Sequence, residues 1–164
     1  MDITIRSGID AAVTLATSAE EVALGEPLQL FADVSSLRAL PVRDAVLSLN
    51  LNQSVTSASM PGADCVARAY SVTCTVAELP GGATRRLTVL SNTDAAGPLY
   101  AAASVTAAGD GDLTNNSGTA RAWVQAARDV ELTAGPADVE LAVGEAYELP
   151  LMVRAHAVRR QPLR

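Results

Sequence analysis

Two cysteines are the residues of this sequence whose chemistry is easiest to anticipate. Cys65 and Cys74 are separated by eight residues, and no neighbouring side chains have the spacing of a metal site. We expect a disulfide between them, and the alternative is two reduced thiols in the core of a cytosolic protein. A disulfide would stabilise the fold by about 3 kcal/mol through closing a short loop in the unfolded chain, and it would place the protein outside the cytosol.

A second group of candidate ligands is rich in oxygen atoms. Asp110, Asp112, Asn115 and Asn116 fall within seven residues. Because Ca²⁺ takes about six to eight oxygen ligands from carboxylates and carbonyls, these four residues are a candidate calcium site. The pattern differs from that of an EF-hand, since no Glu closes a twelve-residue loop. The alternative is structural, because Asp and Asn also form turns by bonding to their own backbone.

The remaining residue types argue against catalysis, nucleic-acid binding and membrane insertion. His156 is the single histidine, and the chain has neither a Gly-x-Ser-x-Gly elbow nor a glycine-rich phosphate loop, so we expect no enzyme and no organic cofactor. The twelve basic residues are all Arg and are outnumbered by eighteen acids, and the net charge of −6 disfavours nucleic acid as a partner. No apolar run is long enough for a membrane helix.

Short alternations of apolar and polar residues indicate the elements that must hold these sites. We expect strands over residues 12–16, 22–24, 28–34, 45–51, 72–76, 86–91, 99–107 and 119–125. Pro27 should begin a strand, and Leu47, Leu49 and Leu51 should face the core. Many short strands without a helical period predict an all-β, antiparallel Greek-key sandwich of immunoglobulin-like type. Trp123 is expected in the core or between domains, and not on a ligand surface.

An internal repeat sets the domain organisation. When the sequence is shifted by 119 residues, residues 10–34 align with residues 129–153 without a gap, and eight of the 25 positions are identical. The identical pairs are Asp10/Asp129, Thr14/Thr133, Glu21/Glu140, Ala23/Ala142, Gly25/Gly144, Glu26/Glu145, Leu30/Leu149 and Val34/Val153. The same shift places residues 3–5 on residues 122–124. We therefore expect the last strand of a preceding repeat, or an N-terminal extension, in residues 1–8, one sandwich in residues 9–127, and the opening strands of a second, incomplete repeat in residues 128–164.

Several short motifs resemble those of the DUF11 repeat. They are Leu24-Gly25-Glu26, Val72-Thr73-Cys74-Thr75, Leu79-Pro80-Gly81-Gly82 and Asp112-Leu113-Thr114-Asn115-Asn116-Ser117. DUF11 is a bacterial and archaeal cell-surface module related in architecture to CARDB-type adhesion domains. The resemblance covers residues 10–127 and resumes at residue 129, and the loop at residues 35–44 departs from the family pattern.

The resemblance implies an extracellular or cell-surface spacer, with neighbouring repeats or other copies of the chain as partners, and no catalysis. The alternative is an adhesion or ligand-binding module that contacts a glycan or a protein through its loops. A solvent-exposed cluster of Tyr70, Tyr100 and Trp123 would favour that alternative, because binding surfaces usually present aromatic and Arg side chains.

Overall fold

The structure of the chain is a computed structural model that describes residues 8–126, 128–135, 140–144, 146 and 148–157. The described residues form two compact units, which divide between Gln125 and Ala126. The strand expected in residues 1–8 lies outside the described residues, apart from Gly8.

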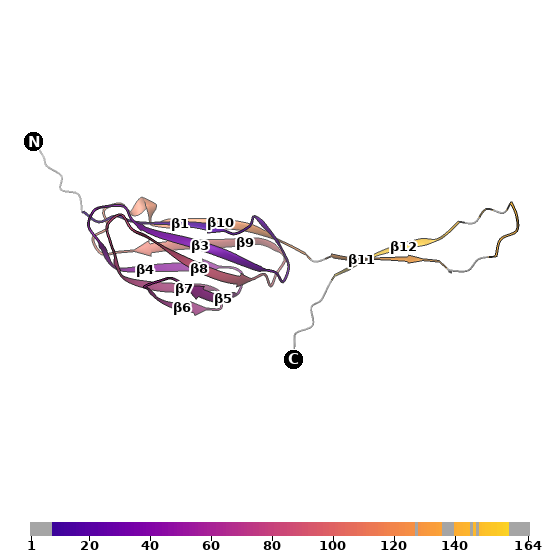
Figure 1. The fold of residues 1–164 in the computed structure, drawn as a ribbon, viewed down its shortest axis with the longest axis horizontal. Coiled ribbons are helices and arrows are strands. Elements are labelled where there is room, and N and C mark those ends of the chain that lie inside the picture. The colour runs from indigo at the N-terminus through magenta and orange to yellow at the C-terminus, as the bar shows by residue number, and fades with distance from the viewer. Residues whose placement is uncertain (1–7, 127, 136–139, 145, 147, 158–164) are drawn as a thin grey trace, which may run out of the picture. The chain divides into compact units, whose positions relative to one another are not determined.

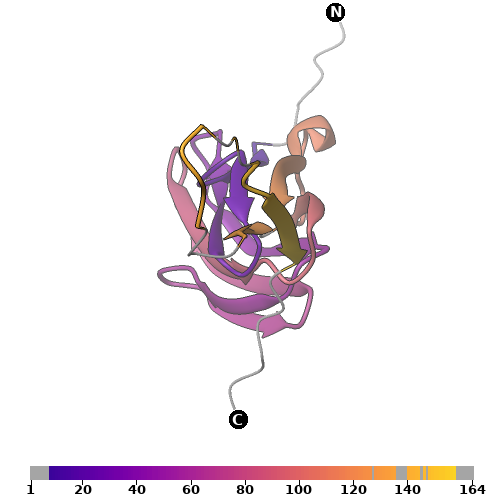
Figure 2. The ribbon, with the colours of Figure 1, turned by 90° about the vertical axis from the view of Figure 1, so that its right-hand side faces the viewer.

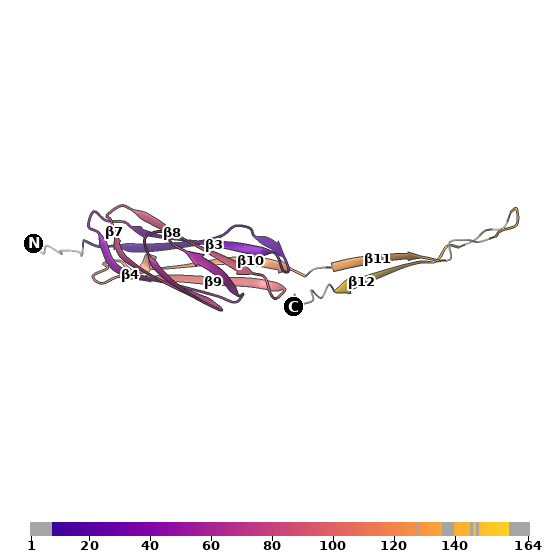
Figure 3. The same ribbon diagram turned by 60° about the horizontal axis from the view of Figure 1, so that its bottom comes forward.

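The first unit is a sandwich of two β-sheets (Figures 1 and 3). The four-stranded sheet has the order β1-β3-β8-β5, formed by β1 Ala11–Thr17, β3 Pro27–Ser36, β8 Thr84–Asn92 and β5 Val55–Ser59. The six-stranded sheet has the order β2-β10-β9-β4-β7-β6, formed by β2 Glu21–Ala23, β10 Ser117–Gln125, β9 Gly97–Thr106, β4 Val42–Leu51, β7 Ser71–Leu79 and β6 Asp64–Arg68. Because the chain crosses repeatedly between the sheets, the expected immunoglobulin-like all-β sandwich is confirmed.

The core lies between the two sheets, which Figure 2 shows end-on. Leu47, Leu49 and Leu51 point inward from β4, as the alternation of their strand predicted. Small side chains such as Ala32 and Ala103 fill much of the remaining space. The sheets therefore pack closely, and a Cβ atom at Gly118 of β10 would lie only 3.1 Å from the backbone nitrogen of Leu15 in β1.

Three features of the sandwich differ from the sequence-based expectation. Strands β5 and β6 were missed, because both are short edge strands whose side chains are mostly exposed and do not alternate clearly. Strand β2 pairs in parallel with β10, so the sheet is not entirely antiparallel. A single 3-10 turn, η1 Leu113–Asn115, interrupts the connection between β9 and β10.

A buried threonine fixes the turn between β2 and β3. Thr93 is 1% exposed, and its hydroxyl lies 3.0 Å from the carbonyl oxygen of Ala23 and 2.7 Å from that of Glu26. The same hydroxyl accepts a hydrogen bond of 2.8 Å from the N–H group of Gly25. Gly25 has a φ of 85°, a conformation that glycine adopts without steric cost.

The variant Thr93→Val should therefore destabilise the sandwich although it preserves the shape of the side chain. Removing the hydroxyl leaves partly buried backbone groups of the turn without one of their partners, which should cost about 1–2 kcal/mol in the free energy of unfolding. Thr106→Val, at an exposed position of β9, is the matched control. Chemical denaturation of the two variants measures the difference, and equal stabilities would contradict this role of Thr93.

The second unit is a hairpin of β11 Arg128–Ala134 and β12 Leu151–Ala157. Its register reproduces that of β1 and β3 at the offset of 119 residues, since Leu132 pairs with Val153 as Val13 pairs with Val34. Gly144 also has a positive φ, 95°, like its counterpart Gly25. The backbone of the hairpin thus repeats the first and third strands of the sandwich.

Candidate functional sites

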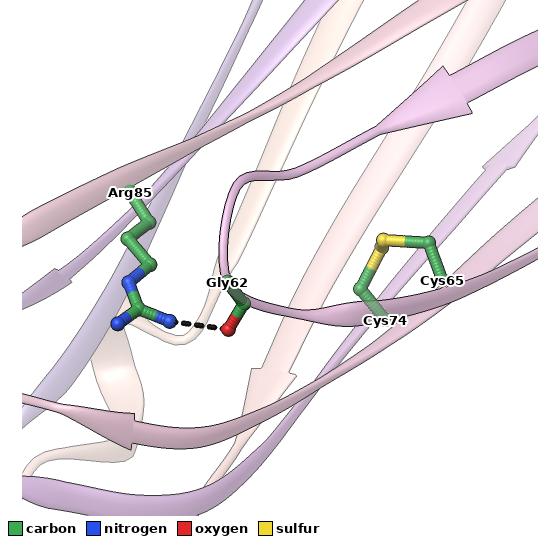
Figure 4. Close-up of a disulfide and its surroundings, with 4 residues drawn as sticks. All are labelled: Gly62, Cys65, Cys74 and Arg85. Carbon is green, nitrogen blue, oxygen red and sulfur yellow. Dashed lines mark hydrogen bonds between the residues drawn. A yellow bond between two sulfur atoms is a disulfide. The ribbon is translucent and has the colours of Figure 1, made fainter.

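The two cysteines form a disulfide between adjacent strands. Cys65 in β6 lies directly opposite Cys74 in β7, and their Cα atoms are 4.1 Å apart (Figure 4). The bond joins an edge strand to its neighbour within one sheet, unlike antibody disulfides, which bridge the two sheets. Arg85 of β8 donates a hydrogen bond of 2.6 Å to the carbonyl oxygen of Gly62, and this contact holds the connection between β5 and β6 to the four-stranded sheet.

The disulfide compensates for an unusual turn. The hairpin of β6 and β7 has only Ala69 and Tyr70 between its paired ends, Arg68 and Ser71. Two-residue hairpin turns favour residues with positive φ such as Gly and Asn. Among the described residues, the only one other than glycine with a positive φ is Asp44, so this turn lacks the usual geometry. A covalent bond is therefore an effective way to fix the register of β6.

The structure joins three of the four candidate calcium ligands, Asp110, Asn115 and Asn116, to the start of β1 at Asp10 and Ala11. Asp110 accepts hydrogen bonds from the backbone of Ala11 (3.3 Å) and from the side-chain amide of Asn116 (2.9 Å). The Asn115 amide donates a bond of 2.8 Å to Asp10. In a separate contact, Asp112 caps η1 by accepting a bond of 3.0 Å from the backbone N–H of Thr114. The cluster thus joins the start of β1 to the segment between β9 and β10.

The carboxylates of this cluster accept hydrogen bonds, whereas two of its amide oxygens do not. Asp110 and Asp112 each accept a hydrogen bond from the backbone two residues on, at Asp112 (3.1 Å) and Thr114 (3.0 Å), which are local turns of the kind considered above, whereas Asp10 accepts a long-range bond from Asn115. Within the described part of the chain, the Oδ1 atoms of Asn115 and Asn116 are buried and accept no hydrogen bond. No group of three His, Cys, Asp or Glu side chains there has a metal-binding arrangement. Sequence analysis missed Asp10, although its identity with Asp129 in the repeat was a signal.

A third candidate site lies on the outer face of the six-stranded sheet. Tyr100 of β9 and Trp123 of β10 are 49% and 52% exposed, so Trp123 does not lie in the core, one of the two places expected for it. Arg121 lies opposite Tyr100 across the strand pair, and its guanidinium carbon is 5.3 Å from the centre of the tyrosine ring. Pro98 lies opposite Trp123. Alternation along β9 and β10 places all four side chains on the same face, a signal that the sequence already contained.

Backbone hydrogen bonds connect Tyr70, through Leu51 and Asn52, to Tyr100 in the same sheet. The carbonyl oxygen of Tyr70 accepts a hydrogen bond of 3.0 Å from Leu51, and the next residue, Asn52, donates one of 3.3 Å to the carbonyl oxygen of Tyr100. The side-chain amide of Asn52 continues this pairing with bonds of 2.9 Å to Pro98 and 2.8 Å from Tyr100. All three aromatic residues are exposed, but only Tyr100 and Trp123 line a common depression, so the expected cluster is present without the Tyr70 ring.

An ion pair lies on the four-stranded sheet, between β3 and β8. Arg86 donates two hydrogen bonds of 2.7 Å to the carboxylate of Asp33, and its guanidinium carbon lies 5.3 Å from the centre of the Phe31 ring. Hydrogen bonding to Arg86 holds the pKa of Asp33 below its usual value. His156 falls on β12, and its side chain lies outside the described residues.

Comparison with known proteins supports the fold. No family model and no curated protein matches the chain. A crystal structure of the CARDB domain of PF1109 from Pyrococcus furiosus, in complex with di-metal ions, matches with a TM-score of 0.54 and 16% identity, over 74% of this chain and 98% of that one. The fold is CARDB-like. A solution structure of the same domain matches with a TM-score of 0.52 and 15% identity, over 71% and 96% of the two chains.

A cohesin from Archaeoglobus fulgidus also matches, with a TM-score of 0.45 and 13% identity, over 68% of this chain and 91% of that one. Among the described residues of the CARDB-like chain, no helix has the length and apolar character needed to cross a bilayer.

Proposed function

We propose that the chain is a structural repeat module of a bacterial extracellular or cell-surface protein, in which such sandwiches follow one another as spacers of a stalk. The kinship with DUF11 repeats is part of this proposal. The observation that carries it is the common register of β11–β12 and β1–β3 at the offset of the sequence repeat. The proposed role includes no catalytic step.

The hairpin exposes apolar side chains at positions that are buried in the sandwich. Leu149, Leu151 and Val153 occupy the positions of Leu30, Ala32 and Val34, which are fully buried in the first unit. In the hairpin these three side chains are between 52% and 66% exposed. Strand β3 pairs on its second edge with β8, whereas β12 pairs only with β11 among the described strands. Two strands alone are marginally stable in water, so a covering sheet would stabilise the hairpin.

The disulfide supports a location outside the cytosol. Thiols are kept reduced in the cytosol of most organisms, and disulfides persist in oxidising compartments. No free cysteine is found among the described residues, and Cys65 and Cys74 account for both cysteines of the chain. A spacer in such a compartment gains resistance to unfolding at its edge strand without enlarging its core.

A chimera tests whether the hairpin opens a second sandwich. Residues 128–153 are joined directly to residues 35–127, because Val153 stands where Val34 stands in the repeat. Leu151→Ala is included, since Leu151 replaces the fully buried Ala32. We expect a cooperatively unfolding monomer with hydrogen-exchange protection in the hairpin strands. A chimera that remains unfolded, while residues 9–127 alone fold, would contradict the repeat-module function.

The chimera also has a matched control. Leu132 takes the place of the buried Val13, so Leu132→Asp should unfold the chimera. In the original chain Leu132 is exposed, and the same substitution should leave the melting temperature of the first unit unchanged. Equal effects in both chains would mean that the hairpin does not adopt the expected orientation.

Association of copies is the partner interaction that this proposal predicts. The apolar face of the hairpin and its free strand edges can be covered by another copy of the chain. Light scattering of the full chain should show a mass that rises with concentration, whereas a version ending at Ala127 should remain monomeric. Identical monomeric masses at every concentration would exclude self-association and leave the chimera test unaffected.

A calcium site at Asp110, Asp112, Asn115 and Asn116 remains a separate proposal. It is supported by the two buried Asn oxygens without a hydrogen bond and by the neighbouring carboxylate of Asp10. The similar CARDB domain of PF1109 was crystallised in complex with di-metal ions. We expect Ca²⁺ to raise the melting temperature and to bind in calorimetry, and the double variant Asn115→Ala/Asn116→Ala to abolish both effects. An absence of heat at millimolar Ca²⁺ would exclude the site.

A further inference from the structure

The exposed rings of β9 and β10 form a surface that the spacer role does not require. We define the ring platform as Pro98, Tyr100, Arg121 and Trp123, together with Glu20, whose backbone carbonyl accepts a hydrogen bond of 2.7 Å from Trp123. The inward-facing neighbours Leu99 and Ala122 already supply the core. Rings on the outer face therefore add nothing to the packing of the sandwich.

The platform also differs from the repeated part of the chain. At the offset of 119 residues, Thr4 stands at the position of Trp123. A residue needed for every contact between successive modules would be expected in each copy. Trp123 is also the only tryptophan of the chain, and half of its surface is in contact with solvent.

Two shallow depressions lie on either side of the row formed by Tyr100 and Arg121. One has a volume of about 330 Å³, and Asn50, Asn52, Ala102 and Thr119 contribute to its lining. The other has a volume of about 380 Å³ and is lined in part by Glu20, Pro98 and Trp123. Both include Tyr100 and Arg121, so a ligand lying across the strands can contact both depressions at once.

The chemistry of this surface selects an uncharged, polyhydroxylated ligand. Aromatic faces pack against flat apolar groups such as the C–H face of a sugar ring. Asn50 and Thr119 supply neutral polar groups that can both donate and accept hydrogen bonds. Arg121 and Glu20 carry opposite charges, so the platform has no net charge to attract an ion. The lining of the first depression includes the small side chains of Ala102 and Ala120, which leave room for an extended chain.

We propose that the ring platform binds a neutral polysaccharide chain, with sugar rings against Tyr100 and Trp123 and hydroxyl groups hydrogen-bonded to Arg121, Glu20 and Asn50. This inference goes beyond the spacer function and does not depend on it. A module of an extracellular stalk would thereby also contact a glycan, through a sheet face and not through its loops.

Tryptophan fluorescence tests the proposal directly, because Trp123 is the single tryptophan and belongs to the platform. The full chain is titrated with soluble cello-, chito- and malto-oligosaccharides. We expect at least one series to shift the emission of Trp123 to shorter wavelength, with affinity that increases with the length of the oligosaccharide. Tyr100→Ala should weaken that binding about tenfold or more, as expected for an aromatic anchor.

Controls separate binding from folding. Tyr100 is half exposed, so the melting temperature of Tyr100→Ala should equal that of the unaltered chain. Tyr70→Ala removes an exposed aromatic ring that lines neither depression and should bind as the unaltered chain does. The proposal is overturned if no oligosaccharide changes the emission, if Tyr100→Ala binds normally, or if a protein ligand occupies the platform while all sugars fail. None of these results would affect the outcome of the chimera experiment.

Discussion

Reduction of the disulfide is expected to lower the melting temperature of the sandwich by about 10 °C, because Cys65 and Cys74 close a short loop at the edge of the six-stranded sheet. The loss corresponds to about 3 kcal/mol on the chain-entropy model. Part of it should appear as local opening, since the turn of Ala69 and Tyr70 does not favour the hairpin by itself. Calorimetry with and without a thiol reductant measures the change.

The double variant Cys65→Ala/Cys74→Ala is the control for the reduction experiment. It should melt near the temperature of the reduced protein, and the reductant should have no effect on it. Cys74 is fully buried, so this variant also loses some packing and sets a lower limit for stability. Two titratable thiols in unfolded, unreduced protein would show that the bond is not formed, and would remove the support for an extracellular location.

Gly81→Ala is expected to destabilise the sandwich by about 3 kcal/mol, near the upper end of the cost of an overpacked site. A Cβ atom at this position would overlap the carbonyl group of Ala39 and lie 2.7 Å from the carbonyl oxygen of Arg38. Both are backbone atoms, so no side-chain rotation relieves the clash. The turn between β7 and β8 is further tied to this loop by a bond of 2.9 Å from Gly82 to the carbonyl oxygen of Ser36.

Gly82→Ala is the control for Gly81→Ala. Gly82 has a φ of 75° and open space around it, so Gly82→Ala should cost only the strain of a left-handed residue, about 1 kcal/mol. Urea denaturation of the two variants separates steric overlap from backbone strain. A loss for Gly81→Ala no larger than that for Gly82→Ala would show that the loop at residues 37–41 moves aside freely.

The loop at residues 35–44 is held by these contacts. It packs on the turn of Pro80, Gly81 and Gly82. Its leucines Leu37 and Leu40 are nevertheless more than half exposed. The loop is therefore anchored through its backbone more than through its side chains.

Local sequence determined most of the sandwich. Alternation placed Leu47, Leu49 and Leu51 in the core, and Pro27 marked the first residue of β3, because strand periodicity and the missing N–H of proline act within a few residues. The repeat anticipated the register of β11 and β12, because copies of a sequence with the same buried positions favour the same pairing. The spacing of Cys65 and Cys74 favoured a disulfide but did not exclude reduced thiols, and the pairing of β6 with β7 brings the two residues together.

Tertiary structure alone decided which residues meet across the fold. Strands β5 and β6 lack clear alternation, and their pairing depends on neighbours far along the chain, namely β8 and the disulfide partner in β7. Asp10 reaches Asn115 only because β1 lies beside the connection of β9 and β10. Tyr100, Arg121 and Trp123 become one surface because β9 and β10 pair in a particular register, which brings outward side chains of distant segments together. Sequence periodicity specifies the face of a side chain, whereas its neighbours depend on the pairing of strands.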